Sequence, residues 1–400
     1  MSLEYLDNLC DSISETFDKN KEEIVLINTS DVFNGKVLNH EFVPNENIKG
    51  QFKKKFSKED ILYSEIRPAN KHFAFVDFDA ENYVASTKLM VLRAKKDKIL
   101  PKYLYFLLKS KFMLKFLQGL AESRSGTFPQ ITFSELSTIS IELPSLDKQE
   151  KIVEFLDNIE RKIENSKQIN KNLESILELL YLNTFVKFEN YDKTKGMRKD
   201  ETFGEIPSSW SVEMLEDYVD FVTGVEPGSK NYHEIKEEND MPFIRVGDLG
   251  SRDNQVYIDK NLSRNKILEY DDIVLSLDAT VGIVKMGLEG AYSTGMRKLV
   301  IKNDSINKPF LYCLVKSTRI QRIIETFATG TTILHAGKSI KHMNFVLSDK
   351  ETMNNFNEIG EPIINKILKN QKEIEKLSKL RDNLLPKLMS GEIDVSKINL

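Results

Sequence analysis

Residues 146–181 read LDKQEKIVEFLDNIERKIENSKQINKNLESILELLY and contain neither proline nor glycine. Without a breaker, this run predicts one continuous helix, and about 33 residues at 1.5 Å each would make it roughly 50 Å long. The residues of one face follow a heptad, which is the spacing of a helix that packs lengthwise on another helix. They are Ile152, Leu156, Ile159, Ile163, Ser166, Asn170, Leu173, Leu177 and Leu180.

A second stripe of the same kind lies close to the C-terminus. Gly360 and Pro362 are expected to start or kink its helix, and Pro386 and Gly391 to end it. The members of this stripe are Phe356, Ile363, Ile367, Asn370, Ile374, Leu377 and Leu384.

Neither helix is apolar enough to stand alone, so two narrow stripes in one chain predict that the helices pack on each other. Because a whole domain lies between them, antiparallel packing would give a pseudo-twofold axis. Asn170 and Asn370 fall at seam positions, where they either meet as a buried polar pair that sets the register or both face solvent. The expected pairing residues are Ile159, Ile163, Asn170, Leu173, Ile363, Ile367, Asn370 and Leu377.

The chain also repeats itself. Segments of the second half match segments of the first in the same order, at a shift of roughly 204–217 residues. The matched pairs are 2–7 with 211–216, 27–32 with 244–249, 59–64 with 271–276, 104–110 with 311–317, and 126–127 with 330–331. Each match is weak, but their collinearity indicates a tandem duplication with copies of about 200 residues.

Within each copy, short apolar runs bounded by turn residues predict strands, with one or two helices such as 102–120 among them. The expected strands are 24–27, 73–76, 89–92 and 139–141 in the first copy, and 243–246, 273–277, 299–301 and 345–347 in the second. The predicted fold class is α+β, with two strand-rich mixed α/β domains joined by two long antiparallel coiled-coil helices. The expected boundaries are 1–145 for the first domain, 146–189 for the first long helix, 190–203 for a linker, 204–347 for the second domain and 348–400 for the second long helix.

Composition limits the class of protein. The 400 residues are 40 % hydrophobic and 30 % charged, as expected for two or three globular domains. Two cysteines exclude a disulfide scaffold and fit a reducing cytoplasm. The acidic residues of the first 17 positions argue against a signal peptide, and no apolar run approaches the ~18 residues of a membrane span. With 57 basic against 61 acidic side chains, nucleic-acid binding would need a local patch.

The sequence offers little catalytic chemistry. It has no phosphate-binding glycine-rich loop, no amino-methyltransferase signature and no histidine or cysteine spacing that suits a metal. Asp271 and Asp272 could be metal ligands of a nuclease, but Glu59 and Asp60 stand at the matching place in the first copy, and a polar turn before a strand explains both pairs. The pattern therefore favours a binding or scaffolding protein over an enzyme.

Two similar domains held apart by rigid helices suit a linear ligand with two separated recognition elements, and duplex DNA is the obvious one. Base reading needs polar and basic side chains on loops, with further basic contacts to phosphate. The candidates in the first copy are Lys53, Lys54, Lys55, Arg67, Lys71, Arg124, Thr127 and Gln130. Those in the second copy are Arg264, Lys266, Arg297, Lys298, Thr331, Thr332, Lys338 and Lys341.

Five segments resemble a known family, the specificity subunits of type I restriction-modification systems. Residues 143–152, LPSLDKQEKI, are similar to the start of that family's central conserved helix, and residues 183–189 to its end. GEIPSSW at 204–210 resembles the opening of the family's second recognition domain, and LLPKLMSGEI at 384–393 its C-terminal end. The segment 127–130, TFPQ, is similar to the approach to the last strand of a recognition domain.

The resemblance implies two target-recognition domains, each reading one half of a bipartite site in double-stranded DNA, with the helices setting the spacer. It also implies docking of two methyltransferase subunits and association with restriction and translocase subunits. S-adenosylmethionine, ATP and magnesium would be bound by those partners, with no cofactor, metal or catalysis on this chain. Independently of the resemblance, the composition predicts a cytoplasmic protein without membrane association.

The chain departs from the family pattern in two places. The first domain lacks the Gly-x-Ile-Pro-x-x-Trp preface, and residues 347–351, LSDKE, replace the Pro-Leu-acidic-Gln start at the second helix. Two alternatives to a restriction complex stay open: a methylation system without a nuclease, and a coiled-coil scaffold whose domains bind protein.

Overall fold

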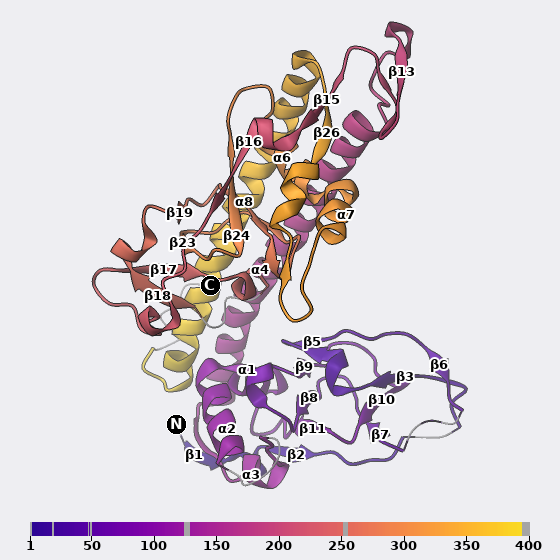
Figure 1. Cartoon of the computed structure of the whole chain (residues 1–400). Coiled ribbons are helices and arrows are strands. Elements are labelled where there is room, and N and C mark those ends of the chain that lie inside the picture. Colours follow the sequence, from indigo (N-terminus) through magenta and orange to yellow (C-terminus); the bar gives the residue numbers. More distant parts are fainter. Residues whose placement is uncertain are drawn as a thin grey trace. The chain divides into compact units, whose positions relative to one another are not determined.

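A computed structural model of the chain describes residues 2–17, 20–46, 48, 50–123, 129–250 and 255–393. The chain folds as two compact units, each described here by itself. Unit 1 comprises residues 1–163 and 376–400, and unit 2 comprises residues 164–375. Two long helices, α4 (Leu146–Tyr181) and α8 (Lys350–Met389), each supply residues to both units (Figure 1).

Unit 1 contains two four-stranded sheets, with the strand orders β6-β3-β10-β7 and β2-β11-β8-β9. In the first sheet β3 and β10 are parallel, and all other neighbouring pairs in both sheets are antiparallel. The strands are β2 (Cys10–Ser12), β3 (Glu23–Ile27), β6 (Val43–Pro44), β7 (Phe52–Lys55), β8 (Ile61–Ser64), β9 (Phe73–Phe75), β10 (Tyr83–Ser86) and β11 (Leu89–Ala94). A two-stranded sheet pairs β1 (Ser2–Tyr5) with β12 (Ser140–Leu143), and a short hairpin pairs β4 (Val32–Phe33) with β5 (Lys36–Val37).

Unit 2 repeats this topology. Its sheets have the orders β18-β17-β23-β19 and β16-β24-β20-β22, and again only the central pair of the first sheet, β17 and β23, is parallel. The strands are β16 (Val219–Thr223), β17 (Asp240–Ile244), β18 (Val256–Asp259), β19 (Ile267–Leu268), β20 (Ile273–Ser276), β22 (Val284–Lys285), β23 (Gly290–Tyr292) and β24 (Met296–Ile301). The pair β15 (Ser211–Met214) and β26 (Asn344–Leu347) matches β1 and β12. The predicted duplication is therefore present in the fold.

A pair of helices follows the sheets in each unit. Unit 1 has α1 (Pro101–Lys109) and α2 (Lys111–Glu122), and unit 2 has α6 (Lys308–Lys316) and α7 (Thr318–Thr326). A single helix was expected over 102–120, but Ser110 leaves the helical conformation and its hydroxyl accepts a hydrogen bond from the Met113 N–H. Ser317 does the same for Ile320, so a serine N-cap divides the pair in both copies.

The remaining short elements complete the two units. They are η1 (Leu6–Asn8), η2 (Thr29–Asp31), η3 (Pro68–Asn70), α3 (Phe133–Ser137), η4 (Leu182–Val186), η5 (Lys193–Lys195), β13 (Met197–Asp200), β14 (Gly204–Pro207), α5 (Leu215–Tyr218), η6 (Ser229–Asn231), η7 (Val246–Leu249), η8 (Lys260–Ser263), β21 (Asp278–Ala279), β25 (Leu334–His335) and η9 (Gly337–His342). Over the described part of the chain, no helix has the length and apolar character of a membrane span.

The predicted linker at 190–203 is wrong, because these residues fold as part of unit 2. Strand β13 pairs with β14, and the side chains of Tyr191, Met197 and Phe203 pack against the main core of this unit. The Arg198 guanidinium donates to the Trp210 carbonyl oxygen at 3.0 Å. Sequence analysis discounted the segment for its many charges, but three large apolar side chains are enough to anchor it.

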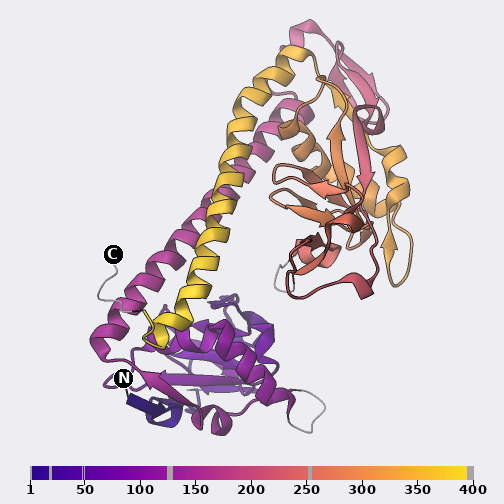
Figure 2. The same cartoon turned by 90° about the vertical axis from the view of Figure 1, so that its left-hand side faces the viewer.

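In unit 2, the two long helices pack antiparallel (Figure 2). Asn170 and Asn370 are both buried and meet at the seam, where Asn370 Nδ2 donates to Asn170 Oδ1 at 2.7 Å. Asn170 Nδ2 in turn donates to the Ile367 carbonyl oxygen at 3.1 Å. Ile367 is fully buried beside them, whereas Leu173 and Ile363 are partly buried. The buried arrangement, and not the solvent-facing one, is the observed arrangement of the two asparagines.

In unit 1, the first half of α4 packs on the last turns of α8. Ile152 and Leu156 of α4 share one apolar core with Leu385 and Leu388 of α8 and with α1 and α2. The expected pairing residues Ile159 and Ile163 are buried, and Leu377 is partly buried.

Helix α8 begins at Lys350 and continues through Gly360 and Pro362, so these two residues do not start it. Pro362 is exposed on the solvent side of the helix and removes only one backbone donor. Gly360 permits close packing instead, because a Cβ built there would lie 2.6 Å from the Cβ of Pro309 and 3.3 Å from Leu177 Cδ1. Pro386 lies inside α8, which ends at Met389.

Candidate DNA-contact surfaces

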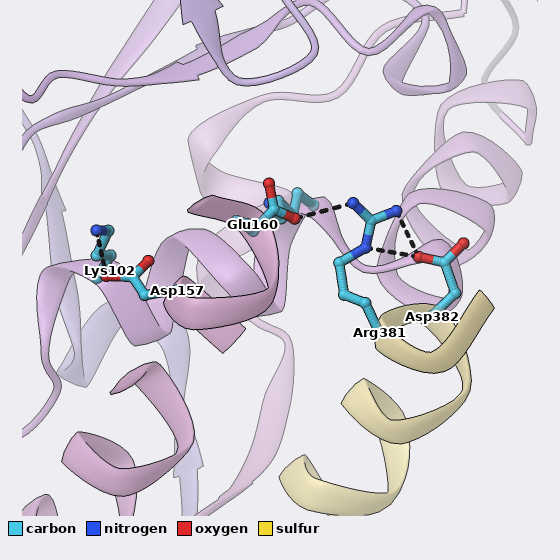
Figure 3. Close-up of polar contacts among 6 residues, drawn as sticks. Lys102, Asp157, Glu160, Arg381 and Asp382 are labelled. Atoms are coloured by element: carbon cyan, nitrogen blue, oxygen red, sulfur yellow. Dashed lines mark hydrogen bonds and ion pairs between the residues drawn. The ribbon is translucent and has the colours of Figure 1, made fainter. Parts of the chain in front are cut away.

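An ion network in unit 1 holds α1, α4 and the end of α8 together (Figure 3). Glu160 Oε1 accepts hydrogen bonds from Lys109 Nζ and from an Arg381 terminal nitrogen, both at 2.9 Å. The Arg381 guanidinium also donates to Asp382. Burial raises the pKa of the Glu160 carboxyl, but the Lys109 and Arg381 charges and their hydrogen bonds outweigh it and leave that pKa below its ordinary value. Glu160 therefore links α4 to α1 and to the end of α8 through paired charges.

The start of α4 is anchored by Gln149, which lies in the segment that carries the family resemblance. Its amide is fully buried, accepts a hydrogen bond from the Leu100 N–H at 2.9 Å, and donates to the carbonyl oxygens of Lys98 and Pro144. Gln149 thus caps α1, whose own N-cap residue Leu100 has no side-chain hydrogen bond.

In the second copy, different residues cap the corresponding helix α6. Asn307 caps α6 by accepting from the Phe310 N–H, and its Nδ2 donates to the Met353 carbonyl oxygen on α8 at 3.0 Å. Asp349 accepts from the Thr352 N–H at the start of α8 and from Trp210 Nε1 at 2.9 Å. Trp210 of the preface found only in the second copy thus contacts Asp349, which lies in the segment LSDKE at the start of the second helix.

In unit 1 the structure brings Arg67, Lys71 and Gln130 together around the turn η3. Arg67 and Lys71 flank this turn, both with positive φ, at 46° and 58°. The Arg67 N–H donates to the Pro129 carbonyl oxygen at 3.0 Å, and Ile66 forms an antiparallel bridge with Gln130. Arg124 and Thr127 lie outside the described residues.

The three consecutive lysines do not act as one patch. They lie on the edge strand β7, where Lys53 and Lys55 are exposed and Lys54 is partly buried. Lys54 Nζ donates to the Leu89 carbonyl oxygen at 2.8 Å. Burial lowers the pKa of Lys54, and the nearby Glu65 carboxylate partly opposes this effect. Lys54 therefore lies beside Leu89 and Glu65, with Lys53 and Lys55 on the opposite side of the strand.

Unit 2 presents a corresponding cluster where β21 pairs with β25. His335 Nδ1 lies 2.7 Å from Asp278 Oδ1, and the other carboxylate oxygen of Asp278 lies 4.0 Å from an Arg297 terminal nitrogen. Arg297 is largely buried and donates to the carbonyl oxygens of Thr294 and Met296, whereas the His335 side chain is 63 % exposed. Burial lowers the pKa of Arg297, which still carries its charge because an arginine pKa is so high.

The other candidates of unit 2 fall into two groups. Thr331 and Thr332 are exposed at the tip of the hairpin that ends at His335, and Lys338 and Lys341 are exposed on the η9 turn that follows it. Arg264 and Lys266 lie just before β19, on another part of the unit, together with Lys298, which donates to the Ile267 carbonyl oxygen. Arg297 and Lys298 point to opposite faces of β24 because successive strand residues alternate.

Asp271 and Asp272, the one carboxylate pair considered for metal binding, are each engaged by a lysine. Lys308 pairs with Asp271, and Lys298 pairs with Asp272 at 2.6 Å. Among the described residues, no group of three or more histidine, cysteine or acidic side chains is arranged to hold a metal ion.

Sequence analysis missed His335 and Asp278 as site residues. The histidines were considered only as metal ligands. In addition, the segments that precede Gln130 and His335 differ in length by one residue, so a comparison of the two copies without gaps does not align these two residues. The signal that could have found them is the matched Gly-Thr pair at 126–127 and 330–331, which lies shortly before each residue.

Comparison with known proteins agrees with this architecture. The family described as the type I restriction modification DNA specificity domain matches the chain twice, at residues 8–175 and 207–379. The type I restriction enzyme HindI specificity subunit of Haemophilus influenzae is 30 % identical, over 97 % of this chain and 98 % of its own length. The MjaIX specificity subunit of Methanocaldococcus jannaschii is 31 % identical, over 76 % of this chain and 71 % of its own. A crystal structure of the type I S subunit from M. genitalium covers 97 % of this chain and 96 % of its own, with a TM-score of 0.56 and 18 % identity, and supports the fold.

Two units of one topology, each of which receives residues from the two long helices, define a protein class built from a duplicated domain. The family match spans most of both halves, and the chain belongs to the specificity subunits of type I restriction-modification systems.

Proposed function

We propose that each unit of this chain reads one half of a bipartite, asymmetric DNA site. The observation that carries this proposal is one topology repeated twice with different polar side chains at its loops. Equal folds would meet two half-sites in the same manner, and unequal side chains would make the half-sites differ in sequence. In unit 1 the surface would be formed by Lys54, Arg67, Lys71 and Gln130, and in unit 2 by Thr331, Thr332, His335, Lys338 and Lys341.

The helices would set the distance between the half-sites and dock methyltransferase subunits. In unit 2, α4 exposes Ile169, Ile176 and Leu179, each about half accessible, at helical spacing. Aliphatic side chains exposed along one line of a helix mark a protein-binding face. Replacing Ile176 and Leu179 by lysine would weaken methyltransferase binding without altering the buried seam at Asn170 and Asn370.

The chain itself would perform no catalysis. Glu160 of unit 1 is paired with Lys109 and Arg381, and Asp271 and Asp272 of unit 2 are paired with lysines. Methyl transfer, and restriction where a nuclease is present, would belong to partner subunits that bind their own S-adenosylmethionine, ATP and magnesium.

The test is a map of N6-methyladenine in cells that express the chain with its neighbouring methyltransferase subunit, against cells that lack the chain. A bipartite motif that depends on the chain supports the proposal. The absence of any new motif, with both subunits present in the soluble fraction, contradicts it and favours a protein-binding scaffold. Binding of the complex to the mapped site should also weaken with salt, by about 0.9 logarithmic units per logarithmic unit of salt for each phosphate contacted.

A further inference from the structure

Gln130 and His335 occupy one equivalent position in the two units. The strands β8 and β20 end at Ser64 and Ser276. In each unit, the carbonyl oxygen of the residue that follows the strand accepts a hydrogen bond from the N–H of a buried residue in a distant segment. Glu65 accepts from the Ile131 N–H at 2.8 Å, and Leu277 accepts from the Ala336 N–H at 2.7 Å.

One residue further along the chain, the same two segments form an antiparallel bridge. Ile66 pairs with Gln130 in unit 1, and Asp278 pairs with His335 in unit 2. The residue after each of them has positive φ, 46° at Arg67 and 62° at Ala279. Backbone pairing and backbone conformation therefore agree, and the equivalence does not depend on the weak sequence match.

The side chains around this position differ between the units. In unit 2, His335 contacts Asp278, and Asp278 faces Arg297. In unit 1 the place of Asp278 is taken by Ile66. Because Ser64 pairs with Leu89 and Ser276 with Met296, the place of Arg297 is taken by Met90. The row of His335, Asp278 and Arg297 in unit 2 thus corresponds to Gln130, Ile66 and Met90 in unit 1.

We propose that Gln130 and His335 each read one base of their half-site, and that the difference at this position contributes to making the half-sites unequal; the inference deepens the proposed function and rests on it. The glutamine amide offers a donor and an acceptor and matches adenine N6 and N7. The Nδ1 of His335 is held by Asp278, so only Nε2 can form a hydrogen bond with a base edge. His335 can therefore make one hydrogen bond to its base, where the amide of Gln130 can make two. Asp278 is a positioning residue, because it sets the orientation of the imidazole.

The experiment starts from the motif mapped with the unaltered chain. The purified complex of chain and methyltransferase is then tested by competition with duplexes that carry each of the four bases at each position of both half-sites. Gln130→Ala should lower the preference by about tenfold or more at one position of one half-site. His335→Ala should do the same at one position of the other half-site, while each variant keeps its preferences in the untouched half, which shows that the complex is folded.

Two further variants separate positioning from general binding. Asp278→Ala should lower the preference at the same base pair as His335→Ala, and the double variant should lose no more than His335→Ala does. Lys338→Ala, a matched control on the adjoining turn, should weaken all duplexes by a similar factor and change no preference.

The outcomes separate the two proposals. If no chain-dependent motif exists, the proposed function itself fails. If the motif exists and both alanine variants keep every preference within about twofold, or lose preference evenly across both half-sites, the assignment of Gln130 and His335 is wrong while the recognition function stands.

Discussion

Glu160 shows how one carboxylate can hold three elements of unit 1. Its partner Lys109 has only 12 % of its side chain exposed, so loss of the Glu160 charge would leave a buried ammonium without its counter-ion. Glu160→Gln should lower the free energy of unfolding by about 3 kcal/mol at pH 7, measured by urea denaturation followed by circular dichroism. Lys102→Ala, at the more exposed Lys102–Asp157 pair, is the control and should cost about 1 kcal/mol or less.

The same variant has a defined pH dependence. In the folded chain the pKa of Glu160 lies below its ordinary value. The contribution of the ionised carboxylate to the free energy of unfolding is therefore fully present at any pH above the ordinary pKa. It is lost as the pH falls through the lower pKa of the folded state. The stability gap between wild type and Glu160→Gln should therefore stay constant from about pH 8 to pH 5.5 and narrow at more acid pH. A gap that widened on acidification would contradict the assigned ion pair.

Asn170 and Asn370 offer a second prediction at the same scale. Changing either one to leucine leaves a buried amide without its partner and should cost about 1–3 kcal/mol. Changing both removes the polar pair altogether and should restore most of that loss, because well-packed leucines replace a buried polar contact at little cost. Unfolding of unit 2, followed by the fluorescence of Trp210, the single tryptophan of the chain, measures both effects. A double variant as unstable as the sum of the singles would show that the seam cannot accept two leucines.

At the scale of elements, Gly360 is needed for packing between α8 and α6. Alanine is favoured over glycine by about 1 kcal/mol inside a helix. At position 360, however, the added Cβ would lie 2.6 Å from the Cβ of Pro309, and the helices would have to separate. Gly360→Ala should therefore destabilise unit 2 by about 1–3 kcal/mol. The matched control is Gly119→Ala on α2, where a Cβ meets no atom within 4 Å, and it should stabilise unit 1 by about 1 kcal/mol.

The same elements show what the sequence could predict. Heptad spacing predicted both long helices and put the two asparagines at seam positions, leaving open whether they meet, and the collinear matches predicted the duplicated topology. The role of Gly360 escaped prediction because a glycine is read as a local signal, whereas the residue that requires Gly360, Pro309, lies about 50 residues earlier in the chain. The sequence did not predict the charged strand β13, because this strand is stabilised by its pairing with β14 and by three apolar side chains of its segment that pack on the core of unit 2. For the candidate site, residue type suggested Gln130 as a base-contacting residue. Its equivalence to His335 can be seen only from the backbone pairing of the two segments.

At the scale of the whole chain, α4 and α8 are continuous helices that each contribute to both units. If they set the spacing of the two half-sites, the spacer should respond to helix length alone. Inserting four residues into both helices, near Lys167 and Gln371, adds about one turn and about 6 Å. Duplex DNA rises 3.4 Å per base pair, so the tolerated spacer should lengthen by about one to two base pairs.

Both insertion points lie on the same side of the Asn170–Asn370 pair along the two antiparallel helices, so the insertion leaves that hydrogen bond in place. Mapping N6-methyladenine with the lengthened chain checks the prediction, and a chain lengthened in α4 alone is the control, because unequal insertion disrupts the helix seam and should abolish methylation. Unchanged half-sites with a longer spacer are expected, since no recognition residue is altered. Changed half-sites with an unchanged spacer would mean that the helices do not measure the DNA, and that contacts made by the recognition surfaces themselves set the spacing.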